Sequence, residues 1–164
     1  MEQKIERTKR TKTPQQALQS LMRMCARSER SSGDALRLMK RWGVADDEAR
    51  KVLTRLQAER FIDDRRFAEA FVRDKLNLSG WGAYKIKMSL RAKGVAREII
   101  EEVVSQMIET TDMKERLEEI MQRKLRTLKY SSTYEAKTKL IRFAASRGYD
   151  IEEAIECSSK ILKD

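Results

Sequence analysis

Three glycines in similar settings divide the hydrophobic pattern of the chain. Gly43, Gly94 and Gly148 lie 51 and 54 residues apart. The positions eight and four before each glycine, and six, nine and ten after it, hold mostly apolar residues: Ala35, Met39, Ala49, Val52 and Leu53; Ile86, Leu90, Ile100, Val103 and Val104; and Leu140, Ala144, Ala154, Cys157 and Ser158. Both sets follow the i, i+3, i+4 spacing of one helix face. The pattern predicts a pair of amphipathic helices around each glycine, which ends the first helix in a left-handed conformation.

A further amphipathic helix precedes each pair. Thr13 and Pro14 predict the N-cap and first residue of one such helix, and Asp63 predicts the N-cap of the next. The three apolar stripes are Ala17, Leu18, Leu21, Met22 and Cys25; Phe67, Ala70, Phe71 and Leu78; and Leu117, Ile120, Met121, Leu125 and Leu128. Segments rich in Ser, Gly and Thr separate the helices at 31–33, 79–82 and 130–133. No segment alternates apolar and polar residues for long enough to predict a strand.

The sequence therefore predicts an all-α fold of nine helices in three tandem three-helix repeats. The repeats span 14–60, 63–109 and 112–163 and follow a flexible basic tail at 1–12. A period of this length is typical of helical repeat proteins, so we expect an elongated, curved helical array. The composition agrees, because Ala, Glu, Lys, Leu and Arg make up half of the chain, with only one Pro and six Gly.

The composition also excludes several classes of function. The chain has no histidine, which removes a histidine general base, a Ser-His or Cys-His nucleophile pair and a His-containing zinc site. Cys25 and Cys157 have no metal or redox spacing, and both are expected to be small buried hydrophobes with a disulfide as the minority alternative. The longest uncharged run, at 13–22, is too short to span a membrane. We expect a soluble, cytoplasmic, non-enzymatic protein with no metal and no cofactor.

Charge is the remaining functional signal. The chain has 36 basic and 26 acidic residues, a net charge of +10 and a pI near 9.7, which is typical of proteins that bind polyanions. The middle helix of each repeat is basic, whereas each third helix begins with acidic residues. The helix dipole favours acid at a helix N-terminus and gives only a weaker structural reason for the basic helices. We expect at least one middle helix to contact a polyanion.

Two stretches of the second repeat resemble the RecX family, bacterial regulators of the RecA recombinase. Residues 61–73, FIDDRRFAEAFVR, are similar to the family's Ile-Asp-Asp-x-x-Phe-Ala core, and residues 82–95, GAYKIKMSLRAKGV, to its Gly-x-x-x-Ile-x-x-x-Leu-x-x-Lys-Gly-Val stretch. The first and third repeats match in helix pattern more than in identity. Most of these motif residues have structural explanations: Asp63 and Asp64 cap a helix, while Phe67 and Phe71 lie on a core face.

The exposed basic residues of the repeats are the candidates for contact with RecA or DNA. They are Arg65, Arg66, Arg73, Lys75, Lys85, Lys87, Arg91 and Lys93 in the second repeat, Arg37, Lys40 and Arg41 in the first, and Lys137, Lys139 and Arg142 in the third, together with the aromatic residues Trp81 and Tyr84. Two positions depart from the expected pattern. Lys75 stands where the family often has Arg, and Trp42 interrupts the basic edge of the first repeat. Trp81 and Tyr84 either stack on exposed bases or pack at a helix junction, and packing is the more common of the two.

We expect a monomer, and the resemblance implies that it binds RecA filaments on single-stranded DNA, with double-stranded DNA left open as a further partner. It implies a modulator, mainly an inhibitor, that lowers RecA's ATP hydrolysis, strand exchange and coprotease activity in homologous recombination, DNA repair and the SOS response. The residues themselves indicate only a basic helical repeat with a polyanionic partner. Two alternatives stay open: a helix-turn-helix DNA-binding regulator, which the acidic starts of the third helices disfavour, and a helical scaffold for an acidic protein.

Overall fold

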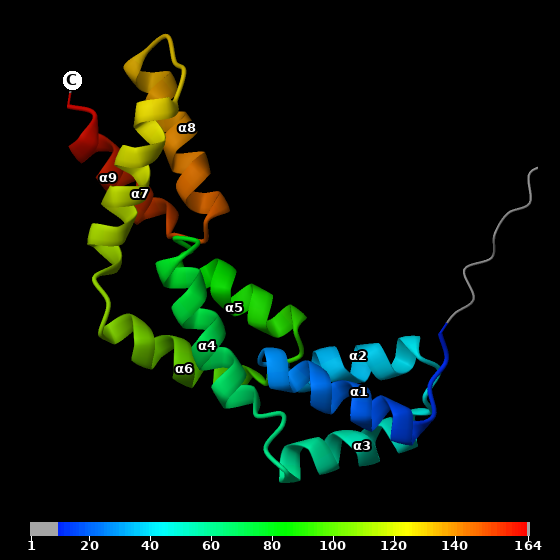
Figure 1. The fold of residues 1–164 in the computed structure, drawn as a ribbon. Coiled ribbons are helices and arrows are strands. Elements are labelled where there is room, and N and C mark those ends of the chain that lie inside the picture. The colour runs from blue at the N-terminus through cyan, green and yellow to red at the C-terminus, as the bar shows by residue number, and fades with distance from the viewer. Residues whose placement is uncertain (1–9, 164) are drawn as a thin grey trace, which may run out of the picture. The chain divides into compact units, whose positions relative to one another are not determined.

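In a computed structural model that describes residues 10–163, every regular element is an α-helix (Figure 1). In chain order the helices are α1 (Pro14–Arg27), α2 (Ser32–Arg41), α3 (Asp46–Ala58), α4 (Asp64–Asn77), α5 (Ala83–Ala92), α6 (Arg97–Glu109), α7 (Met113–Thr127), α8 (Thr133–Ser146) and α9 (Ile151–Ile161). Within these residues the predicted all-α fold of tandem three-helix repeats is confirmed. Most of the predicted basic tail, residues 1–9, lies outside the described residues. Its last residue, Lys12, donates from Nζ to Ser20 Oγ at 2.6 Å and lies 4.4 Å from the ring centroid of Trp42.

The helix ends follow the predicted capping chemistry. Thr13 caps α1 in a capping box with Gln16, and Pro14 is the first helical residue. The three repeated glycines have left-handed backbones, with φ of 77° at Gly43 and Gly94 and 90° at Gly148. Because glycine has no Cβ, it adopts this conformation without the steric strain that other residues meet.

The described residues form two compact units. The first contains the residues up to Phe67 together with Lys93–Val95. Helices α1, α2 and α3 enclose its core, which consists of Ala17, Leu18, Leu21, Ala35, Met39, Val44, Ala49, Val52, Leu56 and Ile62. Met22 and Cys25 of the predicted α1 stripe are only partly buried and pack against this core. Cys25 is a free thiol, and its partial burial raises its pKa.

A close backbone contact joins the start of α2 to the turn after α5 within the first unit. The hydroxyl of Ser31 donates to the carbonyl oxygen of Lys93 at 2.7 Å. A Cβ added to Gly33 would lie 2.6 Å from the Cα of Gly94, which is closer than real Cβ atoms approach. The contact therefore requires glycine at position 33 for space, independently of its backbone conformation.

The two aspartates of the family motif have different partners. Asp63 caps α4 as predicted, because its Oδ1 accepts from the amide of Arg66 at 3.0 Å. Asp64 instead accepts from the amide of Ser32 at 2.8 Å and also from the Ser32 hydroxyl. Its carboxylate therefore stabilises the first turn of α2 rather than that of its own helix.

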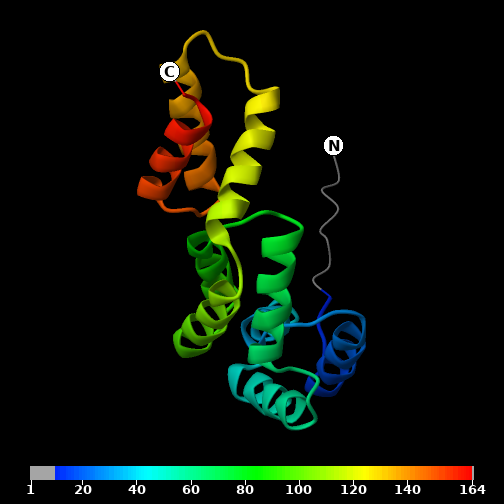
Figure 2. The same ribbon diagram turned by 90° about the vertical axis from the view of Figure 1, so that its left-hand side faces the viewer.

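The second unit contains Ala68–Ala92 and the residues from Ala96 onward. Ile86, Leu90, Ile100, Val103 and Val104 are buried as predicted. Helices α7, α8 and α9 pack around a further core of Leu117, Met121, Leu140, Ala144, Tyr149 and Ala154 (Figures 1 and 2). Cys157 is partly buried against this core, and that burial raises the pKa of its free thiol.

The predicted apolar stripe of α4 is partly wrong. Its buried face consists of Phe67, Ala68, Val72 and Leu76, whereas Ala70 and Phe71 are half-buried and Leu78 is 83% exposed. Leu78 follows the last residue of the helix, so its spacing from Phe71 no longer places it on the same face. Hydrophobic spacing alone could not locate the end of this helix, because Leu78 lies seven residues after Phe71 and so continues the helical spacing.

A second close contact, inside the second unit, joins the start of α5 to the turn after α8. The amide of Gly82 donates to the carbonyl oxygen of Arg147 at 2.7 Å, and the amide of Tyr84 donates to that of Gly148 at 3.2 Å. A Cβ on Gly82 would lie 2.6 Å from the carbonyl carbon of Gly148. As at Gly33 and Gly94, the start of one middle helix meets the glycine turn that ends the next one.

Candidate nucleic-acid interface

The most basic predicted helix, α5, has two of its three lysines and arginines engaged within the protein. Lys85 Nζ donates to the carbonyl oxygen of Ser146 at 3.2 Å. Lys87 Nζ forms a 2.7 Å ion pair with Glu101 of α6, and this hydrogen bond lowers the pKa of the Glu101 carboxyl. Arg91 is exposed and makes no hydrogen bond or ion pair with the described residues. Of the three, Arg91 is the most available to an outside ligand.

Trp81 packs at a helix junction, as the more common alternative for this residue predicts. Its ring meets that of Phe71 in an edge-to-face arrangement, with centroids 6.3 Å apart. The ammonium groups of Lys75 and Lys85 lie 4.5 and 4.4 Å from its centroid. Tyr84, in contrast, is 68% exposed. Tyr84 is therefore the aromatic candidate with an accessible ring.

Arg37 of α2 and Lys93 of the turn after α5 share one acidic partner in the first unit. Asp34 forms an ion pair with Arg37, and Lys93 Nζ lies 3.8 Å from its second carboxylate oxygen. Lys40 and Arg41, one turn further along α2, are exposed and have no ion-pair partner among residues 10–163. The cations of α2 that are available to a ligand therefore lie at its C-terminal end.

Helix α8 shows the same division between its two ends. Lys139 forms a 2.6 Å ion pair with Glu135. Together with hydrogen bonds from Ser131, it lowers the pKa of the Glu135 carboxyl to about 2. Lys137 is half-buried, whereas Arg142 is exposed and has no ion-pair partner in the described part of the chain.

The arginines of α4 also separate into structural and available residues. Arg66 Nε donates to Glu29 at 2.6 Å, and a second guanidinium nitrogen donates to the carbonyl oxygen of Phe61 at 3.3 Å. The hydrogen bond to Glu29 raises the pKa of Arg66. Arg65 is half-buried, and Arg73 is exposed without a partner among the described residues. Arg66 therefore has a structural role, which the family motif alone does not distinguish from a binding role.

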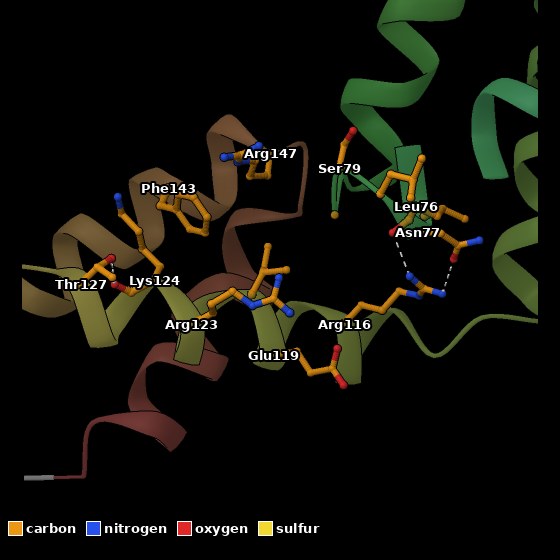
Figure 3. Close-up of a pocket in the computed structure, with 13 residues that line it drawn as sticks. Leu76, Asn77, Ser79, Arg116, Glu119, Arg123, Lys124, Thr127, Phe143 and Arg147 are labelled. Atoms are coloured by element: carbon orange, nitrogen blue, oxygen red, sulfur yellow. Dashed lines mark hydrogen bonds between the residues drawn. The ribbon is translucent and has the colours of Figure 1, made fainter. Parts of the chain in front are cut away.

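One basic groove in the second unit was not singled out from the sequence. It has a volume of about 440 Å³ and lies between the end of α4 and helices α7 and α8. Its lining includes four basic residues, Arg116, Arg123, Lys124 and Arg147, against one acidic residue, Glu119. Figure 3 shows Phe143 and Lys124 at one end of the groove and Arg116 at the other.

The basic residues of the groove differ in how they are held. Arg116 donates to the carbonyl oxygen of Leu76 at 2.8 Å and to Asn77 Oδ1 at 2.9 Å (Figure 3), so it links α7 to the end of α4. Lys124 Nζ and Arg147 Cζ lie 5.3 and 5.1 Å from the ring centroid of Phe143. The periodicity of α7 contained this signal: residues 116, 119, 123, 124 and 127 form one helix face next to Ile120 of the apolar stripe. The apolar stripe of α7 alone does not indicate this basic face.

The described residues contain no group of three or more Cys, Asp and Glu side chains placed to hold a metal ion. Among the same residues, no helix is both long and apolar enough to span a membrane.

Comparison with known proteins identifies the repeats. The family model described as RecX, second three-helix domain, matches residues 63–104, and the model described as RecX, third three-helix domain, matches residues 111–157. Together these models cover more than half of the chain.

Individual relatives agree with the family models. Regulatory protein RecX of Thermus thermophilus is 34% identical over 143 residues, covering 86% of this chain and 89% of the relative. The protein of the same description from Clostridium botulinum is 36% identical over 125 residues, covering 75% of this chain. The matched region spans only 56% of the clostridial protein's length. A crystal structure of RecX from Lactobacillus salivarius has a TM-score of 0.74 at 17% identity and covers 90% of this chain and 96% of its own, which shows a shared fold.

Proposed function

Because the chain belongs to the RecX family of regulatory proteins, we propose that it regulates the RecA recombinase, mainly as an inhibitor, by binding RecA filaments on single-stranded DNA. The bound protein lowers RecA's ATP hydrolysis, strand exchange and coprotease activity, and so acts in DNA repair and the SOS response. It acts by occupying the filament and not through a reaction of its own.

The repeated basic ends of the middle helices support this proposal most directly. Lys40 and Arg91 both lie three positions before the glycine that ends their helix, and both are exposed without an ion-pair partner in the described part of the chain. Cations without internal partners remain available to phosphates, and their contacts release counterions when DNA binds. A basic residue at the same place in successive repeats suits a filament that also repeats.

The acidic starts of the third helices argue against the helix-turn-helix alternative. Asp46, Asp47 and Glu48 occupy the first turn of α3, and Glu152 and Glu153 that of α9. A recognition helix contacts base edges with its N-terminal residues, and carboxylates there would repel the flanking phosphates. The remaining alternative, a scaffold for an acidic protein, predicts binding to such a protein without any affinity for DNA.

Binding to RecA filaments assembled on single-stranded DNA tests the proposal. The double variant Lys40→Glu, Arg91→Glu is expected to bind these filaments at least tenfold more weakly than the wild type. The control variant Arg50→Glu, Lys114→Glu reverses two exposed cations outside the middle helices and is expected to bind like the wild type. Equal weakening in both double variants would show that only net charge matters and would remove the middle helices from the interface.

A further inference from the structure

The groove lined by Arg116, Arg123, Lys124, Phe143 and Arg147, which we name the α7–α8 groove, has a chemistry that its structural role does not explain. Phe143 does not belong to the buried cluster that packs α7, α8 and α9, although Leu140 and Ala144 on either side of it do. It lines the groove instead, half-buried. A large aromatic side chain that lies next to a core without being buried in it is available to contact a ligand.

The charge of the groove is strongly unbalanced. Arg116 is engaged by the end of α4, but Arg123 makes no hydrogen bond or ion pair with the described residues. Lys124 and Arg147 both direct their cations toward the Phe143 ring rather than toward a carboxylate. Three cations therefore lie in one groove without an acidic partner among residues 10–163, and they favour an anionic ligand there.

Apolar surface lies next to these cations. The exposed side chain of Leu78 and part of Ile120 line the groove together with the Phe143 ring. A ligand that contacts this ring lies within reach of Lys124 and Arg147, which are about 5 Å from its centroid. The groove thus fits a ligand in which negative groups and flat apolar groups alternate over a short distance.

We propose that the α7–α8 groove binds a segment of single-stranded DNA, with Arg123, Lys124 and Arg147 contacting phosphates and Phe143 stacking on an unpaired base. This inference rests on the proposed function, because it assigns the DNA contact of that function to a particular site. An exposed base on an aromatic ring, with cations along the backbone, is the usual chemistry of single-strand binding. An acidic peptide would use the cations but not the ring, and a duplex would not offer an unstacked base.

Fluorescence anisotropy without RecA tests the site, using a labelled oligothymidine and an abasic strand of the same length. The double variant Arg123→Gln, Lys124→Gln is expected to bind oligothymidine at least tenfold more weakly. The log–log slope of its affinity against salt concentration should fall by about 0.7 for each phosphate that the variant no longer neutralises. The control variant Lys114→Gln, Lys163→Gln removes two exposed cations outside the groove and should leave the affinity within about threefold of the wild type.

Phe143→Leu separates the base contact from the phosphate contacts while keeping an apolar side chain. It is expected to weaken oligothymidine binding at least fivefold and to leave binding of the abasic strand unchanged. Equal losses of affinity on both strands, or no loss on either, would overturn the stacking contact. For each variant, loss of the helical signal on heating at the same temperature as in the wild type shows that the fold is intact.

The result for the double variant also distinguishes this inference from the proposed function. Wild-type DNA affinity in the Arg123→Gln, Lys124→Gln variant overturns the DNA site. If that variant also binds RecA filaments more weakly, the groove takes an acidic protein segment instead. A wild-type protein that neither binds single-stranded DNA nor changes RecA activity would contradict the proposed function itself.

Discussion

Replacing Gly148 by alanine tests the close contact between the start of α5 and the turn after α8. Gly148 has a φ of 90°, and a Cβ there would lie 2.9 Å from the Cα of Lys85 and closer still to the Lys85 amide nitrogen and Cβ. Gly43 provides a matched control. It has a similar φ of 77°, but the nearest atom to its added Cβ is Thr11 Cγ2 at an ordinary 3.8 Å.

The two substitutions share one energetic cost and differ in another. A left-handed backbone costs an alanine about 1–2 kcal/mol relative to glycine, and this cost applies at both Gly43 and Gly148. Overpacking adds about 1–3 kcal/mol at Gly148 alone, because the clashing Lys85 atoms include backbone and cannot rotate away. Gly43→Ala should therefore cost about 1–2 kcal/mol and Gly148→Ala about 2–5 kcal/mol. At about 2–4 °C per kcal/mol for a chain of this size, the drop in Tm should be clearly larger for Gly148→Ala.

Thermal unfolding followed by circular dichroism at the helical minimum measures both effects on matched preparations. The expected result is a lower Tm for both variants and a further decrease for Gly148→Ala. Equal decreases in Tm would show that the backbone conformation accounts for the whole effect and that the contact with Lys85 contributes nothing.

Three further predictions concern single side chains. Leu76→Ala should lower the free energy of unfolding by about 2–5 kcal/mol, whereas Leu78→Ala should change it by no more than about 0.5 kcal/mol, because only Leu76 is buried. Urea unfolding of the two variants measures this difference. Asp64→Ala should lower the free energy of unfolding, measured in the same way, by about 1 kcal/mol, because the first turn of α2 loses its hydrogen bonds to this carboxylate. An unchanged stability would show that water replaces the carboxylate. The pKa of Glu135 is lowered from its usual 4.5 to about 2, chiefly by the hydrogen bond from Lys139. The ionised carboxylate therefore stabilises the folded protein above about pH 4.5, and this contribution is lost as the pH falls toward 2. The Tm of Glu135→Gln should therefore fall below that of the wild type at neutral pH and approach it through this window, and a constant difference in Tm would contradict the ion pair.

The sequence predicted the helices well because their ends carry local chemical signals. Thr13 with Pro14, and the repeated glycines, determine helix boundaries through capping and backbone conformation, which depend on neighbouring residues only. The α4 stripe was predicted less well, since whether Phe71 or Val72 faces the core depends on tertiary packing. The contact of Asp64 with the start of α2 was likewise out of reach, because its partner Ser32 lies 32 residues away. The elongated, curved arrangement of the repeats stays a prediction.

The candidate site was harder to predict because a cation's availability depends on its partners in space. Lys87 and Arg91 look alike in sequence, yet Lys87 is paired with Glu101 of the next helix, whereas Arg91 has no such pair among the described residues. The α7–α8 groove combines residues from three helices, so no single segment shows it. Periodicity could have indicated the basic face of α7, but not that Phe143 of α8 lies against it.

The rate of ATP hydrolysis by RecA on single-stranded DNA, measured with increasing amounts of this protein, shows most directly whether the chain regulates RecA. We expect the rate to fall progressively toward a low plateau, and we expect the Lys40→Glu, Arg91→Glu variant to need a higher concentration for the same effect. A rate that stays unchanged at a saturating excess of well-folded protein would contradict regulation of RecA by this chain.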